Sequence, residues 1–137
     1  MAVRLVDAIK YILSKEGCVH PFRLSRILAL AELEYYKDKS SRLTDAVYVM
    51  GPGVFYIEGF KEIVESDPCL EKKKGDPQKG TKGCIHIVCG ETPRLPGEAA
   101  GYLDRAIEKA RGLDDLELNS LVVNNENFKK LAKKEGE

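Results

Sequence analysis

Four cysteines and two histidines are the residues of this chain best suited to bind a metal or form a covalent cross-link: Cys18, Cys69, Cys84, Cys89, His20 and His86. They form two Cys-x-His pairs, Cys18-Val-His20 and Cys84-Ile-His86, and thiolate sulfur and imidazole nitrogen are the ligands that structural zinc prefers. Neither pair has the Cys-x-x-Cys spacing of a zinc knuckle. We therefore expect no metal site and no cofactor.

The even number of cysteines also permits disulfides. Cys69 and Cys84 flank a loop of turn-forming residues, so we predict a bridge between these two, while Cys89 could instead reach back to Cys18 in the core. The alternative is that the cysteines are buried and reduced, because free cysteine packs as a small apolar side chain.

Lysines are frequent in the short segment from residue 72 to residue 82. Five of them stand against a single acid, Asp76, for a local net charge of +4: Lys72, Lys73, Lys74, Lys79 and Lys82. Lysines on a protruding loop can neutralise phosphates without reading bases, so duplex DNA is one expected partner. The alternative is that these lysines only solvate a loop tip, since the segment contains no arginine and no aromatic residue for stacking.

Residue patterns that would indicate catalysis are absent from the sequence. Neither histidine has a nucleophile and a carboxylate near it in sequence, and Gly51-Pro52-Gly53 is a turn motif rather than a phosphate-binding loop. Asp114 and Asp115 stand where a helix begins, where acids favour the helix dipole. We expect a binding protein and no enzymatic activity.

Length and composition indicate one domain, residues 1–137. The chain has 137 residues, of which 43% are hydrophobic, and its 22 basic and 22 acidic side chains give no net charge. No stretch approaches the roughly 20 apolar residues that span a bilayer, so we expect a cytoplasmic protein with no membrane partner. Lysine and glutamate are abundant and glutamine occurs once, a bias reported for thermophile proteins, in whose cells disulfides are common.

Apolar periodicity predicts a mostly helical α+β fold. The predicted elements are a helix from Leu5 to about Gly17, a central helix from Pro21 through Tyr35, an extended piece at 46–50, a helix at 54–65, a hairpin at 67–90, helices at 97–111, 114–123 and 125–131, and a frayed tail at 133–137. Three helices followed by a hairpin is the order of a winged helix. We therefore predict a winged-helix-like unit (1–66), its hairpin wing (67–90) and a C-terminal helical extension (97–134).

Residues 24–65 contain a series of short motifs in a characteristic order. A leucine-rich run ends in Tyr35-Tyr36 and is followed by Arg42-Leu-Thr44, Tyr48-Val49 and Gly51-Pro52. In this order the segment resembles the Panacea domain, the SocA-like antitoxin family, and the later hairpin and helices fit the same template. The resemblance implies an antitoxin-like protein that binds another protein. A generic winged-helix regulator gives nearly the same pattern.

Three functional hypotheses follow. In a DNA-binding regulator the third helix enters the major groove and the five lysines contact flanking phosphates. In an antitoxin-like regulator a helical surface covers the active or binding site of a partner protein, and the lysines are incidental. The rival is a structural or assembly protein that forms a homodimer through its helices.

Overall fold

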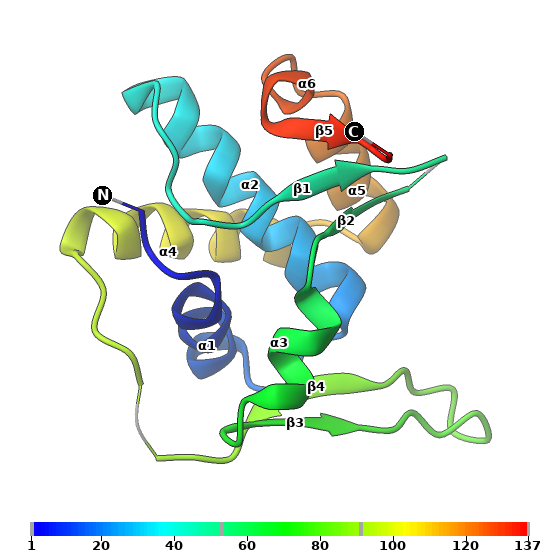
Figure 1. The fold of residues 1–137 in the computed structure, drawn as a ribbon. Coiled ribbons are helices and arrows are strands. Elements are labelled where there is room, and N and C mark those ends of the chain that lie inside the picture. The colour runs from blue at the N-terminus through cyan, green and yellow to red at the C-terminus, as the bar shows by residue number, and fades with distance from the viewer. Residues whose placement is uncertain (1, 53, 91, 137) are drawn as a thin grey trace.

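The computed structural model describes residues 2–52, 54–90 and 92–136, which form an α+β fold that is mostly helical (Figure 1). In chain order the elements are α1 (Leu5–Glu16), α2 (Pro21–Lys39), β1 (Tyr48–Met50), β2 (Phe55–Ile57), α3 (Phe60–Ser66), β3 (Leu70–Lys73), β4 (Cys84–Ile87), α4 (Gly97–Arg111), α5 (Asp115–Val123), α6 (Phe128–Leu131) and β5 (Ala132–Lys134). None of the described helices is long and apolar enough to cross a membrane.

The first two helices begin where the sequence predicts, and α1 also ends there, whereas α2 continues past the predicted Tyr35 to Lys39. Gly17 has a φ of 85°, a left-handed conformation that glycine adopts readily, and its N–H donates to the Leu13 carbonyl at 2.8 Å to end α1. Pro21 occupies the first turn of α2, where its missing N–H has no intrahelical partner to lose. His20 caps this helix, because its Nδ1 accepts a hydrogen bond from the Phe22 N–H at 3.1 Å.

Helix α2 is the centre of the core, as its broad apolar surface predicts. Every residue from Leu24 to Leu33 is buried, and the helix packs mainly against α4 and α5, with α1 as a further neighbour. Figure 1 shows α2 running through the middle of the molecule. The polar side chains of a helix buried on all sides need partners inside the protein. Two of the buried side chains of α2, Arg26 and Glu32, are charged.

Glu32 is fully buried and fixes the turn that leads into β1. Its carboxylate accepts hydrogen bonds from the backbone N–H of Leu43 and Thr44, from Thr44 Oγ1 at 2.6 Å, and from Arg42 Nη2 at 3.1 Å. Four donors satisfy most of the oxygen lone pairs, so the charge is compensated without water. The turn at 42–44 is thereby held against α2.

A small sheet forms where the sequence predicts an extended piece and a helix. β1 pairs antiparallel with β2, with Tyr48 opposite Ile57 and Val49 opposite Tyr56. The predicted helix at 54–65 is therefore wrong in its first half. Phe55 and Ile57 are buried while Tyr56 is exposed, which is the alternation of a strand, and Gly59 at φ 72° separates the strand from a seven-residue α3.

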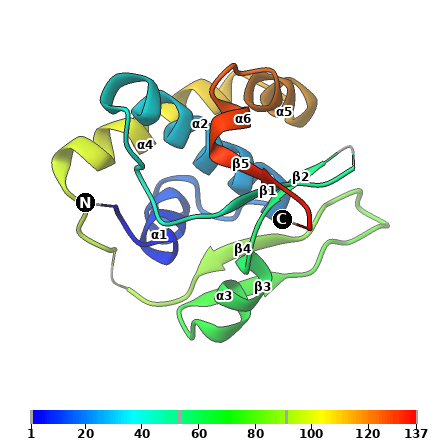
Figure 2. The same cartoon turned by 45° about the horizontal axis from the view of Figure 1, so that its top comes forward.

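The C-terminal segment is ordered against this sheet, which corrects the prediction of a frayed tail at 133–137. β5 pairs parallel with β1, with Lys133 opposite Val49, and the Glu135 N–H donates to the Met50 carbonyl at 3.1 Å. Lys133 also pairs with Glu58 at 3.2 Å. The sheet order is β2-β1-β5 (Figure 2), and Glu137 lies outside the described residues.

The remaining predicted elements are present, although the last helix begins at Phe128 and not at the predicted Asn125. The hairpin consists of β3 and β4, α4 ends before Gly112, and Asp114 caps α5 with Glu117 in a reciprocal capping box. Helices α1, α2 and α3 precede the hairpin as predicted, but the β1–β2 pair stands between α2 and α3. In space, however, α3 packs mainly against β3, and α2 makes its largest contacts with the C-terminal helices.

A first prediction concerns the core. Leu28 is fully buried, so Leu28→Ala should lower the free energy of unfolding by about 2 to 5 kcal/mol through lost apolar burial and the cavity left behind. Chemical denaturation measures this change. Leu116→Ala is the matched control, because Leu116 is 77% exposed and the change should stay within about 0.5 kcal/mol. Equal effects of the two substitutions would contradict the assigned core.

A second prediction concerns the buried carboxylate. Glu32→Gln places an amide N–H₂ against backbone donors, so it should lower the free energy of unfolding by about 3 kcal/mol or more. Glu34→Gln, on the half-buried side of the same helix, should change it by less than about 0.5 kcal/mol. A parent-like denaturation curve for Glu32→Gln would show that this carboxylate does not hold the turn.

Candidate functional site

The lysine-rich hairpin projects from the body of the molecule, and its base is joined to the core (Figure 1). Ile85 is fully buried, and it exchanges two backbone hydrogen bonds with Val19, the residue after the α1–α2 turn, at 3.0 and 2.8 Å. Leu70 on β3 is also buried. The base of the hairpin is therefore part of the core, and the loop at 74–83 extends beyond it.

Two disulfides cross-link this region, one between the hairpin and the α1–α2 connection and one between the two ends of the hairpin, and their pairings differ from the predicted ones. Cys18 is bonded to Cys84 and Cys69 to Cys89, with Cα atoms 5.4 and 5.0 Å apart. The predicted Cys69–Cys84 bridge and the Cys18–Cys89 alternative are both wrong, and the cysteines are not reduced.

Strand register explains the correct pairing. Cys84 lies opposite Lys73 at the loop end of the hairpin, whereas Cys69 precedes Leu70, which lies opposite Ile87 at the other end. Cys69 and Cys84 are thus at opposite ends of the two strands. The Cys69 carbonyl accepts from the Val88 N–H at 2.8 Å, which brings Cys89 beside it.

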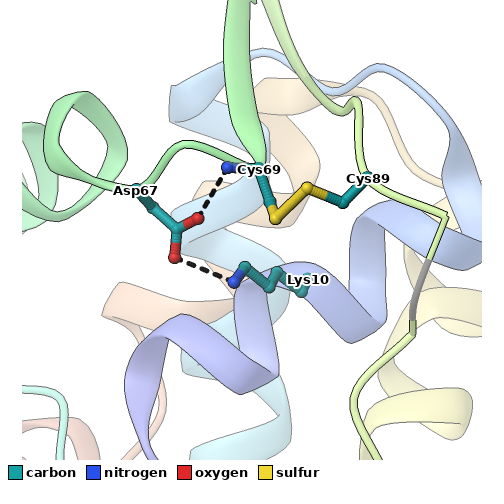
Figure 3. Close-up of a disulfide and its surroundings, with 4 residues drawn as sticks. All are labelled: Lys10, Asp67, Cys69 and Cys89. Carbon is teal, nitrogen blue, oxygen red and sulfur yellow. Dashed lines mark hydrogen bonds and ion pairs between the residues drawn. A yellow bond between two sulfur atoms is a disulfide. The ribbon is translucent and has the colours of Figure 1, made fainter.

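The Cys69–Cys89 disulfide is held in place by an ion pair from α1. Asp67 Oδ1 accepts a hydrogen bond from the Cys69 N–H at 2.8 Å, and Asp67 Oδ2 lies 2.8 Å from Lys10 Nζ (Figure 3). The hydrogen bond from Lys10 lowers the pKa of the Asp67 carboxyl. Asp67 is therefore ionised at neutral pH and fixes the start of β3 on α1.

The two Cys-x-His pairs lie side by side, because Cys18 is bonded to Cys84 and Val19 pairs with Ile85, but their side chains have other partners. The sulfurs are in disulfides, His20 caps α2, and His86 Nε2 lies 3.5 Å from Glu71 Oε1 across the hairpin. Within the parts of the chain that the structure describes, no three His, Cys, Asp or Glu side chains come together as a metal site would require.

The five predicted lysines lie together on the exposed hairpin, but two of them are neutralised. Lys72 Nζ is 3.7 Å from Glu65 Oε1 on α3, and Lys82 Nζ is 3.7 Å from Asp115 Oδ2 on α5. Lys73, Lys74 and Lys79 are exposed and have no ion-pair partner among the described residues. The hairpin therefore offers less free positive charge than its sequence indicates.

Helix α3 is poorly suited to the major groove. Its seven residues span only about 10 Å, at 1.5 Å per residue. The exposed charged side chains that it carries are Lys61, Glu62 and Glu65, which sum to a negative charge. This helix would repel phosphates. Neither its charge nor its length supports the prediction that the third helix enters the major groove.

A groove along α5 is a second candidate site, which the sequence analysis missed. Its volume is about 720 Å³, and it is lined by Leu113, Leu116, Glu117, Ser120, Leu121 and Asn124, among others. Leu116 is 77% exposed, the highest exposure among the large apolar side chains of the described residues. The sequence did contain a signal for this site. Leu118 and Val122 already form the buried side of α5, so the further leucine at position 116 must lie on another face of the helix.

The buried face of α5 is clamped onto α2 by two arginines. Arg23 Nη1 lies 2.9 Å from Asp115 Oδ1, and Arg26 Nε donates to Asn119 Oδ1 at 2.9 Å. The Arg26 guanidinium is sandwiched between the rings of Phe22 and Phe55, 3.8 and 4.0 Å from their centroids. Burial lowers the pKa of Arg26 to about 10, so it remains charged at neutral pH. The helix that lines the groove is thus held firmly against α2.

Acidic side chains surround this groove. From residue 113 to residue 127 the chain contains Asp114, Asp115, Glu117 and Glu126 and no lysine or arginine. Asp114 and Glu117 use one oxygen each in the capping box and remain exposed. Asp115 is paired with Arg23 and Lys82, so the free negative charge beside the groove comes from Asp114, Glu117 and Glu126.

Comparisons with known proteins returned no match: no family model, no curated protein and no solved structure is similar to this chain. The resemblance of residues 24–65 to the Panacea domain stays a prediction from the sequence.

The third prediction concerns nucleic acid. If duplex DNA binds through the hairpin, Lys72→Glu/Lys73→Glu/Lys74→Glu should abolish the binding, because these lysines belong to a hairpin segment with a local net charge of +4. A mobility-shift assay with random duplex, at about 50 and 200 mM salt, measures this. Lys109→Glu/Lys129→Glu/Lys130→Glu makes the same change in net charge elsewhere and should bind like the parent. An unchanged salt slope in the hairpin variant would exclude the hairpin as the contact.

Proposed function

We propose that this chain is a non-enzymatic regulatory protein that binds a partner protein, in the manner of an antitoxin, through the groove along α5. The observation that carries the proposal is Leu116, a large apolar side chain left 77% exposed in the lining of this groove. The half-buried Leu113 and Leu121 line the same groove, and a contiguous exposed apolar patch is typical of protein-binding sites. The resemblance to SocA-like antitoxins favours the same class of function.

The chemistry of the groove defines the partner surface. Burial of Leu116 calls for an apolar side chain opposite it, and the acids around the groove call for lysine or arginine at the edge of the contact. We therefore propose a partner segment that carries apolar residues flanked by basic ones. Association should be faster and tighter at low salt, because opposite charges steer the encounter.

Duplex DNA through the hairpin is the second candidate function. Three exposed lysines on a projecting loop support it. Two observations weigh against it: the acids that neutralise Lys72 and Lys82, and the negative charge of α3. The acidic groove next to the Lys82–Asp115 pair would also repel a duplex that lay along the hairpin.

A homodimer through α5 is disfavoured by the same charges. In a two-fold symmetric contact each patch faces its own copy, so the acids of one α5 would meet those of the other. Like charges across an interface cost several kcal/mol. The groove is better matched to a protein of different charge than to a second copy of this chain.

The fourth prediction tests the groove. A photoactivatable cross-linking residue at position 116 should capture a partner in the native host, and the same residue at position 108, on the exposed side of α4, should not. With that partner purified, Leu116→Asp should weaken binding at least about tenfold, since burying one leucine contributes about 1.5 to 3 kcal/mol. Isothermal titration calorimetry measures the affinity.

Val88→Asp is the matched control, because Val88 is also exposed, at 49%, but belongs to the end of the hairpin. It should bind the purified partner like the parent. Equal cross-linking at positions 108 and 116, or parent-like affinity of Leu116→Asp, would contradict the proposal. Size exclusion of the chain alone tests the assembly alternative, which expects a dimer without any partner.

A further inference from the structure

The two disulfides sit in different surroundings. Cys18–Cys84 lies where the hairpin already joins the core, beside the paired backbone bonds of Val19 and Ile85. Both of its cysteines are half-buried. If this disulfide opened, the two hydrogen bonds and the buried Ile85 side chain would still hold its cysteines close together.

Cys69–Cys89 lies at the opposite end, where the chain leaves the hairpin. Cys89 is exposed, and from Cys89 to Leu95 the described residues form no hydrogen bond or ion pair. The Val88 N–H to Cys69 carbonyl bond is the last backbone attachment before the residues that start α4. The disulfide is therefore the main cross-link between the hairpin and the connection at 89–96.

The two sulfur atoms of this disulfide are unequally anchored. Cys69 is held through its N–H by Asp67, which is fixed by Lys10 on α1, as Figure 3 shows. Cys89 has no such restraint, and it lines a cavity of about 350 Å³ with Cys18, His86 and Thr92. A thiol can therefore approach on the Cys89 side, while Cys69 stays in place.

We propose that Cys69–Cys89 is a thiol–disulfide exchange site, reduced by a dithiol while Cys18–Cys84 stays intact. A thiolate of the dithiol attacks Cys89 Sγ and forms a mixed disulfide, and the electron pair of the broken S–S bond leaves on Cys69 Sγ, which takes up a proton. The second thiol of the dithiol then displaces Cys89. The protein gains two thiols, and the reductant becomes a disulfide.

Reduction at this site frees one segment of the chain. The connection at 89–96 loses its cross-link, whereas the hairpin stays docked through Cys18–Cys84 and Ile85. Helix α4 limits the change at its other end, because Ala99 and Leu103 are buried in the core. The site thus switches whether the chain after Cys89 is cross-linked to the hairpin, independently of any partner bound at α5.

The fifth prediction tests the order of reduction on the full chain. Oxidised protein is incubated with increasing dithiothreitol at pH 7.5, trapped with N-ethylmaleimide and analysed by peptide mass spectrometry. Cys69 and Cys89 should become labelled at concentrations at least about tenfold lower than Cys18 and Cys84. Simultaneous labelling of all four cysteines, or earlier labelling of Cys18 and Cys84, would overturn the proposal.

Amide hydrogen exchange provides the second readout. In Cys69→Ser/Cys89→Ser the Val88 amide, which donates to the Cys69 carbonyl, should exchange at least about tenfold faster, while the amides of Val19 and Ile85 keep the protection of the parent. Cys18→Ser/Cys84→Ser is the matched control and should leave the exchange of the Val88 amide unchanged. If this control variant does not fold, the order in which the cysteines of the parent are labelled still tests the proposal. Faster exchange throughout the hairpin of the Cys69→Ser/Cys89→Ser variant would show that this disulfide holds the whole hairpin and not the connection alone.

Discussion

The burial of α2 on every side is the constraint on which the other elements depend. Ten consecutive residues, Leu24 to Leu33, are covered, so the two charged side chains among them must find partners inside the protein. Glu32 takes its donors from the turn before β1, and Arg26 takes Asn119 from α5 and a ring from β2. The sheet and the C-terminal helices are thereby positioned by the polar side chains of α2 as well as by its leucines.

This arrangement separates the interior contacts of α5 from its free surface. Leu118 and Val122 face the core, and Arg23 and Arg26 hold the helix against α2. Leu116 is then left on the outside with no element of the described chain to cover it. A rigid helix with an exposed apolar side chain loses little conformational entropy when a partner binds, which favours recognition at this place.

Much of the fold could be predicted from the sequence, because helical periodicity and caps are local signals. Gly17, Pro21 and Asp114 mark helix ends through their own backbone or side-chain chemistry. The wrong predictions concern segments whose structural partners are distant in the sequence. β5 exists only because it meets β1 more than 80 residues earlier, and the cysteine pairing depends on the register of the hairpin and its contact with Val19. The lysines were located correctly, but Asp115, which neutralises Lys82, is distant in sequence.

A net charge of zero conceals two local charges that lie side by side. The hairpin segment is positive, the flanks of α5 are negative, and the Lys82–Asp115 pair joins them. A polyanion such as DNA would meet attraction and repulsion within one contact, whereas a protein surface can place opposite charges against each region. Because complementary charge patterns mainly determine specificity and association rate, such a mixed surface favours a partner with its own matching pattern. For this reason the distribution of charge, and not its sum, is the better guide to what this chain binds.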